Sequence, residues 1–374
     1  MKKILIVTSS YQFVRSFLIP HIEYLVRNGW IVDVASDNDG KPIPHVRKQI
    51  DIPVKRTPFH RSNIVAIKQL AQHLDKEQYD IINCHTPIGA MIARLASCKA
   101  RRRGAKVVYM AHGFHFYKGA PWINWMLYYT AEKCLAHKTD AIVTINEEDR
   151  LNASRYFPEI PRQYYLTGIG YDENHVGVCN IDEQNKLRAQ YNLRDDDFVC
   201  IYMARYARHK KQAFLIKAIS ELKKHIPNCK LILLGEGEEM DTCRRLAQEL
   251  NITDAVIFAG YQPHISGFMR IADVGVSASA MEGLPINIVE EMSIALPIVA
   301  SDIRGHRDLI ENGKNGMLYA LDDTADFVEK LIYLYEHPEE RKNMGEMAQK
   351  NIAKYSAENI VPQLADIFES VLLL

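Results

Sequence analysis

The sequence predicts an α/β protein with two parallel-sheet domains. Short apolar runs alternate with longer amphipathic segments along the whole chain, which is the pattern of a parallel sheet covered by helices on both faces. The chain has 374 residues, of which 47% are hydrophobic, so it is long enough for two domains with a core each. We expect these domains at residues 1–172 and 173–355, followed by a last helical segment at 356–374.

In the first half, short apolar runs predict buried strands, and apolar residues with helical spacing predict helices. The expected strands are 4–8, 31–35, 81–84, 106–111 and 141–144. The expected helices are 17–28, which Gly29 ends, 64–74, 88–100 and 122–138. Residues 164–167 lead into a segment with two glycines, 168–172, where we place the end of the first domain.

The second half repeats the strand–helix alternation and therefore predicts a second parallel sheet. The expected strands are 198–203, 230–234, 255–258, 271–280, which runs into a loop of small residues, and 296–302. Residues 182–191 open this half, and the expected helices are 212–225, 240–250, 267–271, 287–295, 327–336, 338–354 and 357–373.

Charge and cysteine content restrict the classes of function. The net charge is zero, which gives no indication of nucleic-acid binding. Residues 1–172 carry 24 Lys and Arg against 15 Asp and Glu, a net charge of +9, and the remainder carries −9. Such asymmetry indicates that one half contacts an anionic surface. Seven scattered cysteines indicate reduced thiols in the cytoplasm, and no apolar run is long enough to span a membrane.

Two carboxylates eight residues apart, Glu282 and Glu290, surround an apolar segment that begins Gly-Leu-Pro. Pro285 suits a first helical turn, so Glu282 is expected in a loop at a helix N-terminus and Glu290 inside the helix. Free N–H groups and the positive end of the helix dipole would then favour a phosphorylated ligand. The alternative is a solvated loop before a surface helix.

Loops after two other strands carry further candidate residues. Arg205 and Lys210 follow the strand 198–203, and such a cationic pair can neutralise a diphosphate, although a solvated basic loop is the alternative. Gly235-x-Gly237 follows the strand 230–234, but Met240 replaces the third glycine of a dinucleotide fingerprint. A nicotinamide-dependent enzyme is therefore disfavoured.

Histidines follow two strands of the first half. His112 and His115 follow the strand 106–111, and His85 follows the strand 81–84. A metal site is disfavoured, because neither cysteine nor carboxylate completes a ligand set. A functional role for His115 and a structural role, as a histidine with satisfied hydrogen bonds, fit the sequence equally well.

The three second-half motifs, Arg-x4-Lys, Leu-Gly-x-Gly and Glu-x7-Glu, occur in this order and each follows a strand. Together they resemble the family 4 retaining glycosyltransferases. The resemblance implies the GT-B architecture, in which two Rossmann-like domains face each other across a cleft and a C-terminal helix crosses back to the first domain. The string AHGFHFY at 111–117 resembles the bacterial capsule and exopolysaccharide branch.

This resemblance implies a nucleotide-sugar donor, UDP-linked, that is held by the second domain. Arg205 and Lys210 would hold the diphosphate, and Glu290 the ribose. Glu282 would bind the sugar, with His112 opposite. The implied catalytic residues are His112, Glu282, Arg205 and Lys210. The implied donor-binding residues are Arg205, Lys210, Gly235, Gly260, Tyr261, Glu282, Gly283, Leu284, Pro285, Ile286 and Glu290. The resemblance implies no metal, because the cations Arg205 and Lys210 replace it. No cofactor is expected, because the nucleotide-sugar is a co-substrate.

Two positions depart from the family pattern. Ala204 stands where glycine is usual, and the loop 8–13 lacks the glycine pair found in many members near the donor and acceptor. Gln12 and Arg15 are the candidates for the acceptor side. A nucleotide-sugar 2-epimerase of the same fold and a non-catalytic nucleotide-sugar-binding protein are the alternative functions.

The acceptor implied by the branch is a lipid-linked glycan at the inner face of the plasma membrane. A basic segment, 99–106, and a second loop, 118–126, with Trp122 and Trp125, suit an anionic bilayer surface. The protein is therefore expected in the cytoplasm, peripherally associated with the membrane. The alternatives are a solvated helix end and, favoured for the tryptophans, packing in the core.

Overall fold

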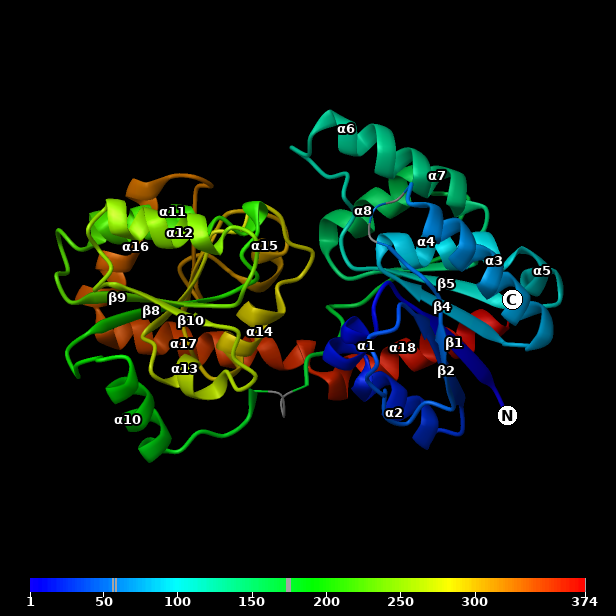
Figure 1. The fold of residues 1–374 in the computed structure, drawn as a ribbon, viewed down its shortest axis with the longest axis horizontal. Coiled ribbons are helices and arrows are strands. Elements are labelled where there is room, and N and C mark those ends of the chain that lie inside the picture. The colour runs from blue at the N-terminus through cyan, green and yellow to red at the C-terminus, as the bar shows by residue number, and fades with distance from the viewer. Residues whose placement is uncertain (56, 58, 173–175, 374) are drawn as a thin grey trace. The chain divides into compact units, whose positions relative to one another are not determined.

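The computed structural model describes residues 1–55, 57, 59–172 and 176–373. The chain forms two compact units, Met1–Gly170 with Ala357–Leu374, and Tyr171–Ser356. Each unit contains one parallel sheet with helices on both faces (Figure 1). The predicted α/β class with two parallel sheets is therefore confirmed. Residue 173, where we expected the second domain to begin, lies outside the described residues.

The first unit contains a seven-stranded sheet with the order β3-β2-β1-β4-β5-β6-β7, and all its pairs are parallel. Its strands are β1 Lys3–Val7, β2 Ile31–Ser36, β3 Lys48–Asp51, β4 Ile81–His85, β5 Lys106–Ala111, β6 Ala141–Thr144 and β7 Arg162–Tyr165. The strand order reverses between β1 and β4. In open parallel sheets, ligands bind beyond the carboxyl ends of the strands at such a reversal.

The helices of the first unit are α1 Tyr11–Phe17, α2 Ile19–Arg27, α3 Arg61–Lys76, α4 Pro87–Ala96, α5 Cys98–Arg102, α6 Trp122–Asn124, the π-helical turn η1 Trp125–Tyr129, α7 Thr130–Ala136, α8 Glu147–Tyr156 and α18 Ala357–Leu372. Two expected helices were wrong in extent. The helix expected at 17–28 begins two residues later, as α2, and Phe17 instead ends the separate helix α1. Leu18 separates the two helices, and Pro20, which lacks an N–H group, lies in the first turn of α2. The helix expected at 88–100 is divided at Ser97.

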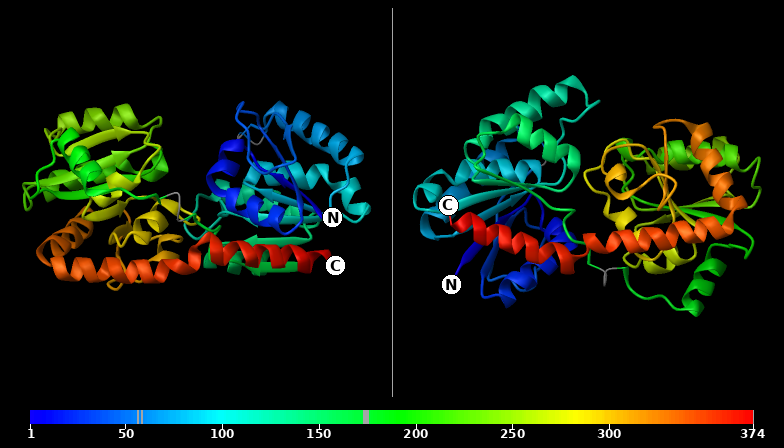
Figure 2. Two further views of the ribbon diagram at one scale, coloured as in Figure 1. Left: turned by 90° about the horizontal axis from the view of Figure 1, so that it is seen from below. Right: turned by 180° about the vertical axis from the view of Figure 1, so that it is seen from behind.

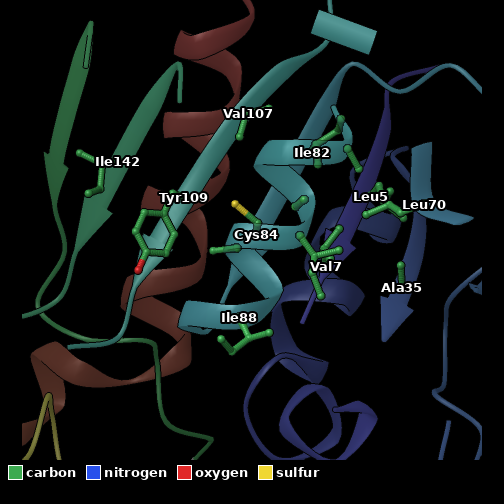
Figure 3. Close-up of a cluster of buried hydrophobic side chains, with 14 of the residues drawn as sticks. Leu5, Val7, Ala35, Leu70, Ile82, Cys84, Ile88, Val107, Tyr109 and Ile142 are labelled. Carbon is green, nitrogen blue, oxygen red and sulfur yellow. The ribbon is translucent and has the colours of Figure 1, made fainter. Parts of the chain in front are cut away.

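The core of the first unit fills the space between the sheet and the helices α3 and α4. Figure 3 shows side chains from β1, β4, β5 and β6 meeting Leu70 of α3 and Ile88 of α4. Leu5, Val7 and Ile82 are fully buried there. Burial of such a side chain contributes about 1.5–3 kcal/mol, so this layer holds the strand ends in place.

The last helix, α18, belongs to the first unit (Figure 2). It is amphipathic, and its buried side chains include Val361, Leu364 and Phe368. The ring of Phe368 lies 6.3 Å from that of Trp30, and the Tyr164 hydroxyl lies 2.7 Å from Ser370 Oγ. The helix therefore completes the apolar surface of the first unit beside α2.

The second unit contains a six-stranded parallel sheet with the order β10-β9-β8-β11-β12-β13. Its strands are β8 Phe198–Met203, β9 Cys229–Leu234, β10 Val256–Gly260, β11 Val274–Ser277, β12 Ile298–Ser301 and β13 Met317–Tyr319. Its helices are α10 Ile181–Gln190, α11 Gln212–Leu222, α12 Met240–Glu249, α13 Ser266–Arg270, α14 Ile286–Ser293, α15 His306–Leu309, α16 Thr324–Glu336, α17 Pro338–Ile352 and the short 3-10 turns η2 Arg208–Lys210 and η3 Ala353–Tyr355. The order reverses between β8 and β11, beside the loops that carry the motifs.

Candidate active site

The carboxyl edge of the second sheet brings together the loops after β8, β9, β11 and β12. The loop after β11 is bonded to the loop after β8, because the Ala280 N–H donates to the His209 carbonyl at 2.7 Å. The turn after β9 is bonded to the end of β10, because the Gly235 N–H donates to the Gly260 carbonyl at 2.8 Å. Candidate residues from three separate motifs therefore share one edge of one sheet.

Lys210 and Glu282 form an ion pair at this edge, and their side chains are only 19% and 13% exposed. Burial raises the pKa of Glu282, but the charge of Lys210 and the neighbouring His306 outweigh it and hold the pKa below its ordinary value. Glu282 is therefore ionised at neutral pH. The pair therefore places two opposite charges, both largely buried, at the carboxyl edge of the second sheet.

Buried hydroxyl groups fix the two loops that carry this ion pair. The Tyr202 hydroxyl donates to the Lys210 carbonyl at 3.1 Å and lies 2.8 Å from Ser279 Oγ. Ser301 Oγ donates to the Ser279 carbonyl at 2.6 Å, and the His306 ring lies between Ser301 and Ser277. Sequence reasoning missed these residues, because they come from separate strands and form no motif.

Two glycines let the turn after β9 lie directly against the Arg205 loop. Gly235 has φ +120° and Gly237 has φ +155°, which side chains rarely adopt. A Cβ atom at either position would overlap the carbonyl of Ala204 or of Tyr206. The Tyr206 N–H also donates to the Glu236 carbonyl at 3.0 Å. The glycines of Leu-Gly-x-Gly are thus required by backbone packing.

Arg205 lies in solvent and pairs with Glu238 at 2.9 Å, with both side chains more than half exposed. Its backbone is fixed by Gln212, a buried side chain that donates to the Arg205 carbonyl at 2.9 Å. Gly260 has φ +70°, and the Tyr261 side chain that follows it is 66% exposed. Arg205 and Tyr261 therefore both have room to contact a ligand.

Helix α14 begins beside Glu282. Pro285 is its N-cap, one position before the first helical residue where we expected it, and no side chain caps the first turn. The backbone of residues 283–286 thus leads into the positive end of the helix dipole. Gly305, at φ +77°, approaches this loop so closely that a Cβ atom would lie 2.7 Å from the Gly283 carbonyl oxygen.

Glu290 lies in the second turn of α14 and is 9% exposed. Burial raises its pKa to about 7. Its neighbour Glu291 is fully buried, and burial, with the charge of Glu290, raises its pKa well above the ordinary range. Glu291 packs against Gly275, where any Cβ atom would overlap its carboxyl group. Glu290 therefore titrates near neutral pH, whereas Glu291 is a neutral core residue.

His112 belongs to the first unit, in the loop after β5. Its Nε2 atom lies 2.9 Å from Nδ1 of His85, and the Phe13 ring packs against both imidazoles. Within the described residues, no group of three or more His, Cys, Asp or Glu side chains is placed to hold a metal ion.

A pocket of about 270 Å³ lies at the carboxyl ends of β1 and β4 in the first unit. Its lining includes Ser9, Ser10, Phe13, His115 and Tyr128, so it combines hydroxyl groups with aromatic faces. The rings of His115 and Tyr128 are stacked, with centroids 4.5 Å apart. Such a lining suits a sugar, which presents both hydroxyl groups and apolar C–H faces.

Thr86 lines the same pocket in a strained conformation. Its φ of 60° is costly for a β-branched residue, on the order of 1–3 kcal/mol. Its hydroxyl donates to the His85 carbonyl at 2.6 Å, and Gly89 leaves the space that this hydroxyl occupies. Strain of this kind is typical of functional sites.

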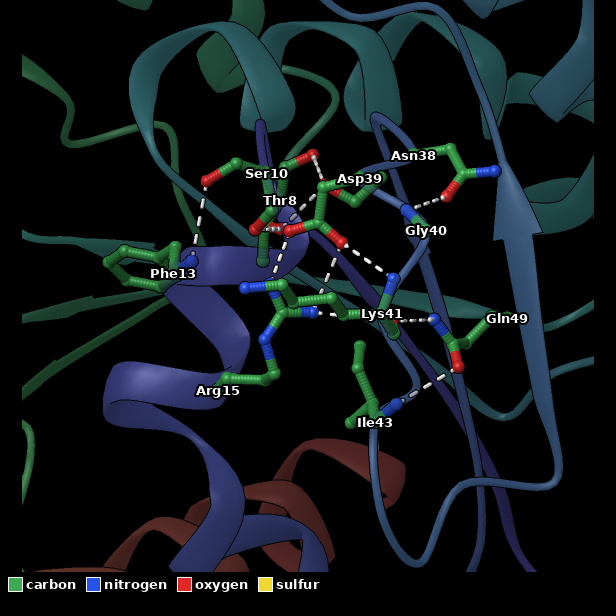
Figure 4. A network of polar contacts seen from close by, with 11 residues as sticks. Thr8, Ser10, Phe13, Arg15, Asn38, Asp39, Gly40, Lys41, Ile43 and Gln49 are labelled. Atoms are coloured by element: carbon green, nitrogen blue, oxygen red, sulfur yellow. Dashed lines mark hydrogen bonds and ion pairs between the residues drawn. The ribbon is translucent and has the colours of Figure 1, made fainter.

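Figure 4 shows how the loop after β1 is held. Ser10 Oγ accepts from the Phe13 N–H at 3.3 Å and begins α1. Arg15 forms an ion pair with Asp39 and donates to the Lys41 carbonyl at 3.3 Å. Arg15 is thus engaged in fixing the loop at residues 37–41, whereas Gln12 is exposed.

The basic segment 99–106 is partly neutralised. Arg101 pairs with Asp140 at 2.7 Å, and Lys99 and Arg103 both pair with Asp75. With the acidic residues of α18 included, the first unit carries 24 Lys and Arg against 17 Asp and Glu, a net charge of +7. The charge asymmetry between the halves thus persists but is smaller.

The two tryptophans of residues 118–126 differ. Trp125 packs against Phe116 and Tyr129, as expected for core packing. That expectation was wrong for Trp122, which is 73% exposed. Ile123, Met126 and Leu127 beside it are also exposed. We call Trp122, Ile123, Met126 and Leu127 the α6 patch. Among the described residues, no helix is both long and apolar enough to cross a bilayer.

The family comparisons cover both units. A family model described as Glycosyltransferase Family 4 matches residues 18–164, and one described as Glycosyl transferases group 1 matches residues 183–351. "Putative glycosyltransferase EpsD" of Bacillus subtilis is 39% identical over 99% of this chain and 97% of that protein. The chain belongs to the family 4 glycosyltransferases and is a glycosyltransferase.

Two further proteins are similar over most of the chain. The "UDP-Gal:alpha-D-GlcNAc-diphosphoundecaprenol alpha-1,3-galactosyltransferase" of Escherichia coli is 25% identical over 69% of this chain and 67% of that protein. The crystal structure of Anabaena Alr3699/HepE in complex with UDP and glucose has a TM-score of 0.81, with 21% identity, and the match covers 99% of this chain and 100% of that one. The fold is therefore GT-B, with two Rossmann-like domains, as predicted.

Proposed function

We propose that this glycosyltransferase moves a sugar from a UDP-linked donor to a lipid-linked glycan acceptor in the synthesis of a surface polysaccharide, such as a capsule or an exopolysaccharide. The observation that carries the proposal is the largely buried ion pair between Lys210 and Glu282, which lies in the loop that leads into α14. Arg205 is exposed on the same loop as Lys210. A UDP-linked donor is supported by the UDP in the HepE complex and by the donor in the name of the E. coli relative.

In this proposal, Arg205 and Lys210 bind the donor diphosphate and stabilise the charge that develops on it. Glu290 accepts hydrogen bonds from the ribose hydroxyls. Gly235, Gly260 and Tyr261 lie beside the nucleotide. Glu282 binds the sugar together with the backbone of Gly283, Leu284, Pro285 and Ile286. No cofactor takes part, because the donor brings its own leaving group.

The reaction retains the configuration of the anomeric carbon. The bond from that carbon to the diphosphate breaks, and the acceptor oxygen bonds to the same face. The departing diphosphate takes the proton of the acceptor hydroxyl. Lys210 and Arg205 supply the positive charge for the leaving group, so no metal ion is needed. His112 forms a hydrogen bond with the sugar.

The acceptor side of the proposal rests on the first unit. The pocket beside Phe13 and Tyr128 binds the acceptor sugar. The lipid carrier stays in the bilayer, and the α6 patch with the net positive first unit holds the enzyme at the inner face of the membrane. The name of the E. coli relative supports a lipid diphosphate acceptor.

Thermal-shift measurements with UDP, GDP and UDP-sugars test the donor site. A ligand that binds only the native state raises Tm through linkage. We expect a UDP-selective rise in wild type that is lost in Arg205→Ala and kept in Arg245→Ala, an exposed arginine elsewhere on the second unit. Absence of any nucleotide response in folded wild-type protein would contradict the donor site.

Transfer to an undecaprenyl-diphosphate-linked sugar in vesicles then tests the acceptor. The anomeric proton coupling of the product reports retention, and activity after EDTA treatment reports metal dependence. The comparisons favour a glycosyltransferase over a nucleotide-sugar 2-epimerase or a non-catalytic nucleotide-sugar-binding protein. Conversion of the nucleotide-sugar to its epimer in the absence of an acceptor would favour the 2-epimerase instead.

A further inference from the structure

Asn83, His85 and His112 form a buried hydrogen-bonded chain that runs from the sheet of the first unit to the loop after β5. Asn83 and His85 both lie on β4 and are 2% and 1% exposed. His85 Nε2 lies 2.6 Å from Asn83 Oδ1, and His85 Nδ1 lies 2.9 Å from His112 Nε2. The chain thus links a core amide to the histidine that the family motif contains.

The direction of each hydrogen bond follows from one fixed end. Asn83 Nδ2 donates to the Val108 carbonyl at 3.2 Å, which orients the amide and points Oδ1 at His85. An amide oxygen only accepts, so His85 must carry a proton on Nε2. If His85 is neutral, its Nδ1 atom is unprotonated and must accept a hydrogen bond from the N–H group at Nε2 of His112.

Both imidazoles are in fact held neutral. Burial, with a smaller contribution from His21, lowers the pKa of His112 to about 3. Burial, with contributions from His112 and His21, lowers the pKa of His85 well below its usual range. His21 is buried as well, and burial lowers its pKa to about 4. A neutral imidazole carries a single proton, so a proton on Nε2 of His112 leaves Nδ1 bare.

We propose that Asn83 and His85 are positioning residues that hold His112 in the tautomer protonated at Nε2, so that Nδ1 accepts a hydrogen bond from a hydroxyl group of the transferred sugar. The Phe13 ring, 5.1 Å from the His112 ring and nearly perpendicular to it, restricts the imidazole from one side. The strained Thr86, bonded to the His85 carbonyl, anchors the chain end of β4.

This inference rests on the proposed function for the identity of the ligand, but the tautomer itself does not. The proposed tautomer requires a hydroxyl group on the transferred sugar that donates a hydrogen bond to Nδ1 of His112. A donor analogue in which that hydroxyl is replaced by fluorine cannot donate to Nδ1 and would be transferred roughly tenfold more slowly. Unchanged transfer of the fluoro analogue would contradict a hydrogen bond from that hydroxyl group to Nδ1.

Long-range ¹H–¹⁵N NMR of protein labelled at histidine nitrogens reads the tautomer directly, and His112→Gln assigns the His112 signals. We expect His112 in the Nε2–H form between pH 6 and pH 8. Asn83→Leu removes the amide that orients His85, so His112 should become a mixture of tautomers and kcat should fall roughly tenfold. His73→Gln, a histidine bonded to Tyr79 instead, is the control and should leave His112 unchanged.

If Asn83→Leu fails to fold, Asn83→Asp serves as a second variant, because aspartate has the shape of asparagine and keeps the Oδ1 acceptor. Its carboxylate should raise the pKa of His85, so lowering the pH would protonate His85 on Nδ1 and force the proton of His112 onto its own Nδ1. Wild-type His112 in the Nδ1–H form, or a tautomer indifferent to both Asn83 variants, would overturn the inference. Loss of UDP binding with the expected tautomer would instead overturn the proposed function.

Discussion

The Lys210 ammonium group and the Glu282 carboxylate neutralise each other at the carboxyl edge of the second sheet, with Tyr202 bonded to the Lys210 backbone beneath them. A cation that is expected to bind a diphosphate is therefore already paired in the free protein. An arriving diphosphate would compete with Glu282 for Lys210, and Glu282 would be released to accept a hydrogen bond from the sugar. Donor binding and sugar recognition would thus be coupled through one ion pair.

Glu282→Gln tests this coupling. The variant frees Lys210, so UDP should bind about tenfold more tightly while sugar transfer falls by at least as much. Leaving Lys210 buried without its partner should also destabilise the fold, on the order of 3 kcal/mol. Isothermal titration with UDP and denaturant unfolding measure the two effects. Glu311→Gln, which breaks an exposed pair with Lys314, is the control, and weaker UDP binding by Glu282→Gln would contradict the coupling.

Gly235→Ala tests the turn after β9. The new Cβ atom would overlap the Ala204 carbonyl at a φ of +120°, so the Arg205 loop must move and UDP affinity should fall more than tenfold. Gly313→Ala is a matched control, because Gly313 also has positive φ but faces open space. That control should cost only the backbone strain, about 1 kcal/mol, with unchanged UDP binding. Equal effects of the two variants on UDP affinity would refute the close backbone approach.

Glu290 predicts a pH dependence of stability. Its pKa is about 7 in the folded chain and about 4.3 when unfolded. Between these values the folded state binds the proton more tightly, so stability should fall as pH rises from 4.5 to 7 and level off above. The difference amounts to about 3 kcal/mol and should vanish in Glu290→Gln. Urea unfolding at several pH values measures it; a wild-type-minus-variant difference that stays flat would exclude the shift.

The same carboxyl group predicts how pH affects ligand binding. In the proposed donor site, ribose hydroxyl groups would donate to the ionised form of Glu290, so UDP should bind more tightly as pH rises through about 7. Titration calorimetry at pH 6 and pH 8 should show this gain in wild type and its loss in Glu290→Gln. Since the UDP phosphate also titrates near pH 6, uridine serves as the control ligand. A pH-independent affinity for uridine would remove Glu290 from the ribose site.

The α6 patch predicts binding to anionic vesicles. Trp122→Ala with Met126→Ala removes the two most exposed side chains of the patch, and the bound fraction should fall several-fold. Co-sedimentation with phosphatidylglycerol vesicles at low and physiological salt measures it. Tyr335→Ala, an exposed aromatic residue of the second unit, should have no effect. Undiminished binding by the double variant would contradict a role of the α6 patch and favour the basic segment 99–106 as the contact with the vesicles.

The sequence predicted the strands and the loops that follow them well, because apolar runs and turn residues are local signals. The strand 198–203 and the loop with Lys210 lie where expected. Elements with a weaker apolar pattern were not predicted. Strand β3 has a polar edge sequence, Lys-Gln-Ile-Asp, with little apolar signal. Helix α8 was missed because charged residues dominate it.

The motif residues of the candidate site were predictable, whereas the residues that support them were not. Tyr202 lies inside an apolar strand and His85 at the end of one, where a polar side chain is most simply explained as a core residue with a satisfied hydrogen bond. Their partners Ser279 and His112 are distant in sequence, and only the sheet register brings them together. Pairing across strands of a parallel sheet leaves no spacing rule to find.

The first unit includes the last helix, so the second unit is an insertion between Gly170 and Ala357. Its two ends are joined to each other, since the Tyr171 N–H donates to the Tyr355 carbonyl at 3.0 Å and Tyr171 is bridged to Ser356. Residues 171–356 can therefore be exchanged as a cassette whose entry and exit points coincide. Chimaeras that place the insert of one relative into the frame of another should fold, and they offer a route by which sugar choice and acceptor choice could be recombined.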